Sequence, residues 1–206
     1  RMFIGELTGG ANNQATVQEW RAKVVAYRDF IYDNEPLVDH DFTDDPGVLE
    51  SQLGALEAVG GGDEPESLLE GLYHAATMDQ TERGEPLSPS KWRYRGDGAR
   101  VVIIFTDASF HEVMEKPEGG TFDDVVNACH SNRIIMQVYA PEMDCYDMLA
   151  EIDKADVHTF SYDKSKDDGA VQALREFTSD KKNFQETLRA LAKTVTQSAQ
   201  TEVIPL

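Results

Sequence analysis

Side chains that carry oxygen gather in three short stretches of the chain. These are "YRDF" (27–30), "GGGDEPES" (60–67) and "TDASFH" (106–111). Carboxylate and hydroxyl oxygens are the ligands that Mg²⁺ and Ca²⁺ prefer, whereas zinc favours nitrogen and sulfur. If the fold brings the stretches together, they would form an oxygen-rich cation site. The candidates are Asp29, Asp63, Glu64, Glu66, Thr106, Asp107, Ser109 and His111.

Each acid also has a purely structural interpretation, which stays open at this point. Asp107 follows an apolar strand and could cap a turn or a helix, and Asp63 could cap the helix after it. Glu66 would lie in the first turn of that helix, where the helix dipole stabilises a carboxylate. Ser109 and His111 are crowded into the turn after Asp107 and no Gly-x-Ser-x-Gly motif occurs, so we do not expect a nucleophilic triad.

Strands and helices must alternate to position these stretches. "RVVIIFT" (100–106) and "RIIMQVY" (133–139) are continuously apolar, as is typical of strands covered on both faces. We therefore predict one α/β domain over residues 1–206, with a doubly wound, mostly parallel sheet flanked by helices. The other predicted strands are 22–27, 36–42 (a half-buried edge) and 156–161, and the predicted helices are 44–59, 64–76, 120–131, 143–154 and 168–197.

Ligands of open parallel sheets gather beyond the carboxyl ends of the strands, where all three stretches would lie. Residues 77–99 are polar and contain Pro and Gly, so we predict a flexible loop. The loop holds the basic-aromatic run "KWRYR" (91–95). Its residues Trp92, Arg93 and Tyr94 are of types common in binding hot spots, but they could equally anchor the loop.

The net charge of −19, from 38 acidic and 19 basic residues, narrows the class of partner. Such a surface repels nucleic acid and anionic lipid and suits cations or basic groups. No apolar run approaches the roughly 20 residues of a membrane span, and the N-terminus has no secretory apolar region. We expect a soluble protein with no membrane insertion, and we favour the cytoplasm.

Several motifs resemble, in their order, those of von Willebrand factor A (VWA) domains. They are "GGGDEPE", then Trp92-Arg93, then "RVVIIFTDASFH". "RMFIGEL" is similar to the helix after the family's metal motif, "VVAYRDF" to its second strand and "LRALAKTV" to its last helix. The resemblance therefore covers nearly the whole chain.

The resemblance implies a metal-ion-dependent adhesion site that holds Mg²⁺, or else Mn²⁺ or Ca²⁺. Asp107 matches the ligand of the family's third loop. Glu66 matches the second-loop ligand of integrin β-type members, and Asp63 would serve an adjacent ion or a bound water. Around them, Thr106, Ser109, Asp29 and His111 would form the rim of the site.

The chain departs from the family in one respect, because it has no Asp-x-Ser-x-Ser motif. In the family that motif ends a central first strand, which precedes the helix with which this chain begins. Without such a strand, strands 22–27 and 100–106 would face each other across a slot with unpaired backbone groups. We expect polypeptide upstream of Arg1 to supply both the strand and the serines.

The function that these features imply is non-enzymatic. We expect a protein-binding module whose divalent cation is completed by a carboxylate of a partner protein. Two alternatives are a VWA adaptor or regulatory subunit of an AAA-type ATPase, and a metal-dependent hydrolase that uses Asp107.

Overall fold

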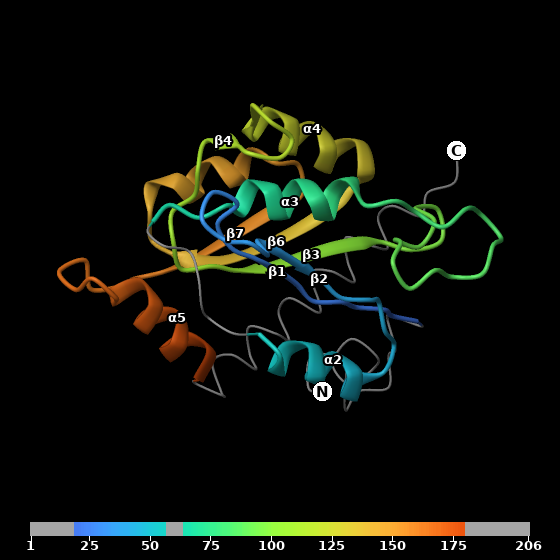
Figure 1. Ribbon diagram of the computed structural model, residues 1–206, viewed down its shortest axis with the longest axis horizontal. Coiled ribbons are helices and arrows are strands. Elements are labelled where there is room, and N and C mark those ends of the chain that lie inside the picture. The colour runs from blue at the N-terminus through green and yellow to red at the C-terminus, as the bar shows by residue number, and fades with distance from the viewer. Residues whose placement is uncertain (1–18, 57–63, 180–206) are drawn as a thin grey trace.

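The computed structural model describes residues 19–56 and 64–179, and its centre is a three-stranded parallel sheet (Figure 1). The strands are β3 (Arg100–Phe105), β6 (Ile134–Pro141) and β7 (Ala155–Phe160), in the order β3-β6-β7. Every residue of β6 is buried, as its continuously apolar sequence predicts. The α/β class is therefore confirmed, although three strands do not establish the doubly wound order.

Helices cover both faces of this sheet. On one face lie α3 (Leu68–Thr77) and α4 (Phe122–Asn132), and on the other lies α5 (Gly169–Ser179) (Figure 1). The main core fills the α3–α4 side, where Leu69, Val125 and Met136 are fully buried. On the α5 side, Phe177 stacks on Tyr139 of β6, with ring centroids 5.8 Å apart. None of the helices in the described ranges is long and apolar enough to cross a membrane.

Strands β1 (Val25–Tyr27) and β2 (Leu37–Asp39) form a separate antiparallel hairpin. Within the described ranges, no β-pairing joins β1 to β3. A cavity of about 240 Å³ lies between the two strands, with Leu68 and Gly71 of α3 also in its lining. This open flank explains why the middle of the apolar strand β3 is only half-buried.

The hairpin is supported by helix α2 (Pro46–Gly54). Its N-cap is Asp45, whose carboxylate accepts a hydrogen bond of 2.7 Å from the Gly47 backbone N–H, and Pro46 occupies the first turn, as the sequence predicts. On the side toward β1, the Gln52 carbonyl accepts from the Val24 backbone N–H at 3.0 Å. The predicted helix 44–59 thus ends at Gly54, and its residues 57–59 lie outside the described ranges.

Two predicted helices differ from those in the structure. Helix 64–76 begins only at Leu68, because Glu66 instead forms a β-bridge with Phe110. Residues 143–154 contain a 3₁₀ helix, η1 (Asp144–Glu151), in place of an α-helix.

The other two predicted helices are present in part. Helix α4 begins with a capping box between Thr121 and Asp124, and just before it lies a small hairpin of β4 (Val113–Met114) and β5 (Gly120–Thr121). Of the predicted helix 168–197, the structure describes α5, and residues 180–197 lie outside the described ranges.

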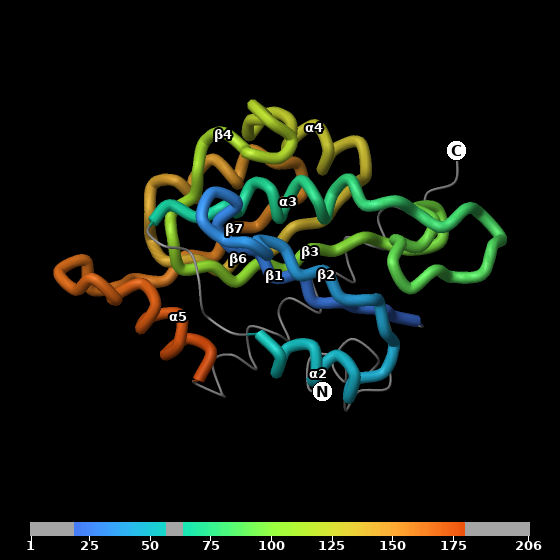
Figure 2. Tube along the Cα trace, in the orientation of Figure 1, coloured from blue at the N-terminus to red at the C-terminus, as the bar shows by residue number. Residues whose placement is uncertain are grey.

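The predicted loop leaves α3 after Thr77 and extends beyond the layers before it returns as β3 (Figure 2). It is irregular but has specific attachments. An isolated bridge joins Gln80 to Trp92, and the Trp92 indole N–H donates to the Ala75 carbonyl at 2.8 Å. The Trp92 ring also packs on Phe42, with centroids 4.9 Å apart. Trp92 is therefore an anchor of the loop, one of the two roles considered from sequence.

Candidate functional site

The second and third oxygen-rich stretches lie side by side at the carboxyl end of β3. The Glu66 backbone N–H donates to the Ser109 carbonyl at 2.8 Å, and the His111 N–H donates to the Glu66 carbonyl at 3.0 Å. A further bond of 2.7 Å runs from the Ser109 N–H to the Glu64 carboxylate. These backbone contacts hold Glu66 close to the segment that follows Asp107.

The first stretch reaches the same place through Asp29, which is fully buried. Its Oδ1 accepts a 2.7 Å hydrogen bond from the Ile31 N–H and lies 3.4 Å from the Ser67 hydroxyl. Its Oδ2 lies 3.5 Å from His111 Nε2, which is an ion-pair distance if the imidazole is protonated. Asp29 therefore links the turn after β1 to both of the other stretches.

A chain of hydroxyl groups supports the end of β3. The Tyr27 hydroxyl donates to Thr106 Oγ1 at 2.7 Å, across the gap between β1 and β3. The Tyr146 hydroxyl, which is fully buried, lies 3.3 Å from Thr106 Oγ1 and donates to the Ala108 carbonyl. Thr106 is thus occupied by two tyrosines and acts as a support of the loop that carries Asp107.

Burial and crowding of negative charge perturb the acids of this site. The pKa of Glu66 is raised first by burial and then by the nearby charges of Asp29, Asp33 and Asp107, while His111 opposes the rise. The pKa of Asp107 is raised mainly by burial, with a smaller contribution from Glu64. Both carboxylates would therefore be more stable with positive charge beside them.

Four buried polar atoms around this site have no hydrogen-bond partner among the described residues. They are Asp29 Oδ2, Glu66 Oε2, Glu70 Oε2 and His111 Nε2. Buried polar atoms without partners are uncommon and call for an explanation such as a bound ion or water. Asp29 Oδ2 and His111 Nε2 face each other at 3.5 Å, so a protonated imidazole would serve both. The Glu66 and Glu70 oxygens are acceptors when ionised, so the group they lack is a donor or a cation.

Two members of this neighbourhood were not found from the sequence. Glu70 is 2% exposed, and its Oε1 accepts from the Glu115 N–H at 2.7 Å. Glu70 is four residues after Glu66, and that spacing would place the two side chains together only if both residues lay in one helix. Glu66 lies before the helix begins. No local pattern identifies Tyr146, because its partners are 38 and 40 residues away.

The donor set is suitable for a hard cation, but the described side chains do not complete a site. Within residues 19–56 and 64–179, no group of three or more His, Cys, Asp or Glu side chains is arranged to hold a metal ion. Glu66 and Asp107 would supply two ligands at most, with Asp29 behind them. Asp63 lies outside the described residues.

The other candidates occupy different positions. Ser109 is bonded through its backbone, and the His111 ring faces Asp29, so no hydrogen bond among the described residues joins the two into a nucleophilic pair. Trp92, Arg93 and Tyr94 precede β3, whereas Asp107 follows it, so these residues do not share a site with the acids. Arg93 is paired with Glu19 at 2.9 Å.

Comparison with known proteins does not add to this geometry. The sequence matches no model of a protein family and no curated protein. The resemblance to VWA domains therefore rests on the motifs of the chain.

Proposed function

We propose that this protein is a binding module that holds a divalent cation, Mg²⁺ or Mn²⁺, at the carboxyl end of β3. Through that cation it would bind a carboxylate group of a partner protein. The observation that carries the proposal is the Glu66 carboxylate, which has a buried oxygen without a hydrogen-bond partner in the described part of the chain and lies within the field of Asp29 and Asp107.

The electrostatics of the site support a cation. Burial raises the pKa of Glu66, and at neutral pH repulsion from the negative charges of Asp29, Asp33 and Asp107 raises it further. A divalent cation would reverse that repulsion, because each carboxylate then gains a positive neighbour. Oxygen ligands of this kind select Mg²⁺ or Mn²⁺ over softer metals.

The roles of the residues follow from their positions. Glu66 and Asp107 would bind the cation directly. Thr106, Tyr27 and Tyr146 keep the loop after β3 in place through their hydroxyl groups. Asp29 and His111 would adjust the charge behind Glu66, and Asp63 would serve the same region as the sequence resemblance implies.

A manganese titration of the full chain tests the cation. Isothermal titration calorimetry would compare the unaltered protein with Glu66→Gln and Asp107→Asn, which remove one charge each. Glu112→Gln is the matched control, because Glu112 is exposed and follows His111 directly. We expect Mn²⁺ affinity to fall about tenfold or more in the two site variants and to stay unchanged in the control.

A second measurement tests the open coordination position. Acetate serves as the simplest carboxylate, and its NMR signal would broaden when it binds to a protein-held Mn²⁺. We expect broadening that a chelator abolishes. If both site variants bind Mn²⁺ as the unaltered protein does, the proposal is wrong.

A further inference from the structure

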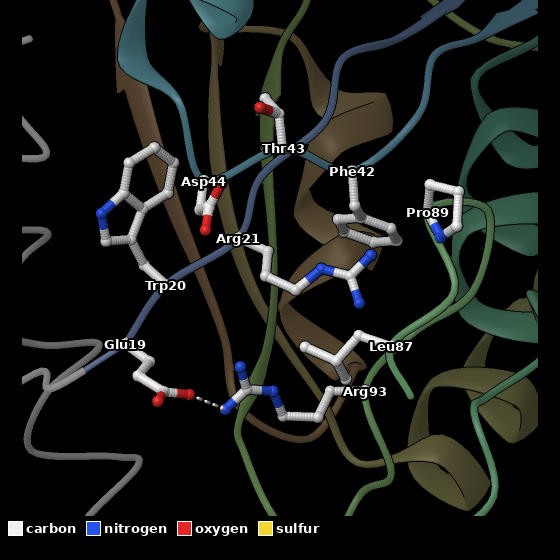
Figure 3. A pocket seen from close by; sticks show the side chains of 9 residues that line it. All are labelled: Glu19, Trp20, Arg21, Phe42, Thr43, Asp44, Leu87, Pro89 and Arg93. Atoms are coloured by element: carbon white, nitrogen blue, oxygen red, sulfur yellow. Dashed lines mark ion pairs between the residues drawn. The ribbon is translucent and has the colours of Figure 1, made fainter. Parts of the chain in front are cut away.

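A second cavity, of about 660 Å³, lies at the other end of the β1–β2 hairpin (Figure 3). Its lining comes from the residues that precede β1, those that follow β2, and the loop before β3. Because the hairpin is antiparallel, the start of β1 and the end of β2 lie together, away from the turn that carries Asp29. The lining residues are Glu19, Trp20, Arg21, Phe42, Thr43, Asp44, Leu87, Pro89 and Arg93.

Backbone hydrogen bonds join these three segments. Ala22 and Thr43 exchange two bonds of 2.9 and 2.8 Å, and the Phe42 N–H donates to the Pro89 carbonyl at 2.7 Å. Arg21 adds a bond of 2.6 Å from Nη2 to the Ser88 carbonyl. The cavity is therefore a formed feature of the fold, and its volume is within the range of small-molecule sites.

Arg21 is the cation at the centre of this lining. Its guanidinium lies 4.7 Å from the centroid of the Phe42 ring, and its Nη1 is buried without a hydrogen-bond partner among the described residues. Burial lowers the pKa of Arg21, and the positive charge of Arg93 lowers it further. An anion would accept a hydrogen bond from the unpaired donor of Arg21 and would reduce the repulsion between Arg21 and Arg93.

A carboxylate of the chain already contacts the second cation. Glu19 pairs with Arg93 at 2.9 Å (Figure 3), but the Glu19 side chain is 71% exposed. Exposed pairs of this kind contribute little to stability, so another carboxylate can displace Glu19 at small cost. Asp44 also lines the cavity and partly offsets the charge of Arg21.

Apart from Thr43, the rest of the lining is apolar. Trp20, Phe42, Leu87 and Pro89 surround the arginines. Leu87 is 47% exposed, so much of its apolar surface is open to a ligand. Four apolar side chains lie on the same lining as the two arginines and the two acids, Glu19 and Asp44, and this mixture suits a ligand with an apolar body and a single anionic end.

We propose that this cavity binds a small organic acid. Its carboxylate would replace Glu19 on Arg93 and reach the unused donor of Arg21, and its aromatic or branched body would lie against Phe42, Trp20 and Leu87. This site is separate from the cation site at the carboxyl end of β3 and does not depend on it.

The test uses 3-phenylpropionate as the probe and its neutral amide, 3-phenylpropionamide, as the matched control. Calorimetry on the full chain in the presence of EDTA excludes any contribution of a divalent cation. A charged hydrogen bond contributes about 1.5–3 kcal/mol, which corresponds to about tenfold or more in affinity. We expect the acid to bind at least about tenfold more tightly than the amide.

Variants assign the binding to this cavity. Arg21→Gln and Arg93→Gln should each weaken binding of the acid about tenfold, and Glu19→Gln should strengthen it severalfold by removing the competing carboxylate. Lys116→Gln makes the same change of charge beside Phe30, after the other end of β1, and should have no effect. In the described ranges, the ion pair of the Arg93 side chain is with the exposed Glu19, so Arg93→Gln keeps the test valid if Arg21→Gln does not fold.

Three results would each overturn the inference. The first is equal binding of the acid and the amide, which would reduce the cavity to an apolar contact. The second is unchanged binding of the acid by both arginine variants, and the third is no binding of the acid at all.

Discussion

Replacing Tyr146 with phenylalanine removes one hydroxyl group from the support of the candidate site. That hydroxyl donates to the Ala108 carbonyl and lies 3.3 Å from Thr106 Oγ1, while the ring remains in the core. Thr106 keeps its bond to Tyr27, so the main loss is the bond to Ala108. A buried hydrogen bond contributes about 1 kcal/mol, and an acceptor left without a partner adds to that, so we expect about 1–2 kcal/mol less stability.

The assay is thermal unfolding followed by circular dichroism. For a chain of this size, 1 kcal/mol shifts Tm by about 2–4 °C, so the expected decrease for Tyr146→Phe is about 2–8 °C. Tyr32→Phe is the matched control, because the Tyr32 side chain is 61% exposed, and it should leave Tm unchanged. An unaltered Tm for Tyr146→Phe would refute the claim that this hydroxyl supports the loop after β3.

Three further predictions concern stability. The pKa values of Glu66, Glu70 and Asp107 are raised by burial, so in the acid range the folded state binds more protons than the unfolded state. Their contribution to the free energy of unfolding is therefore complete below the unfolded pKa, about 4, and is lost as pH rises through the folded pKa. Urea unfolding at several pH values should show that the free energy of unfolding declines less steeply with rising pH in Glu70→Gln than in the unaltered protein. Trp92→Phe should lower the free energy of unfolding in urea by about 1–2 kcal/mol, because the Ala75 carbonyl in α3 loses the indole N–H that donates to it. Asp45→Ala should cost about 0.5–2 kcal/mol by removing the N-cap of α2, and a loss of helical circular dichroism signal without any loss of stability would contradict this.

Much of the central sheet was predictable from the sequence. The apolar runs 100–106 and 133–139 form β3 and β6, since continuous hydrophobicity requires cover on both faces. Asp45 and Pro46 mark the start of α2 because capping is a local property.

The differences arise where distant contacts decide the local structure. Glu66 has the sequence context of a first helical turn, but its backbone pairs with Ser109 and His111, and the helix starts later. The strand predicted over 22–27 is present as β1 only from Val25 to Tyr27, and it pairs with β2 and with no strand of the central sheet in the described part of the chain.

The candidate site was predictable to a similar extent. The three oxygen-rich stretches meet, because Asp29 contacts Ser67 and His111, and the backbone of Glu66 pairs with the loop after β3. Glu70 and Tyr146 were missed, since each acts through partners far along the chain. The distances that decide whether a cation fits depend on tertiary packing, which composition and spacing do not specify.

The most direct test of the central claim is a crystal structure of the protein soaked in Mn²⁺, with anomalous diffraction to locate the ion. The account predicts an anomalous peak at the carboxyl end of β3, with Glu66 and Asp107 oxygens about 2 Å from it. No peak at that position, with clear density for both side chains, would contradict the account.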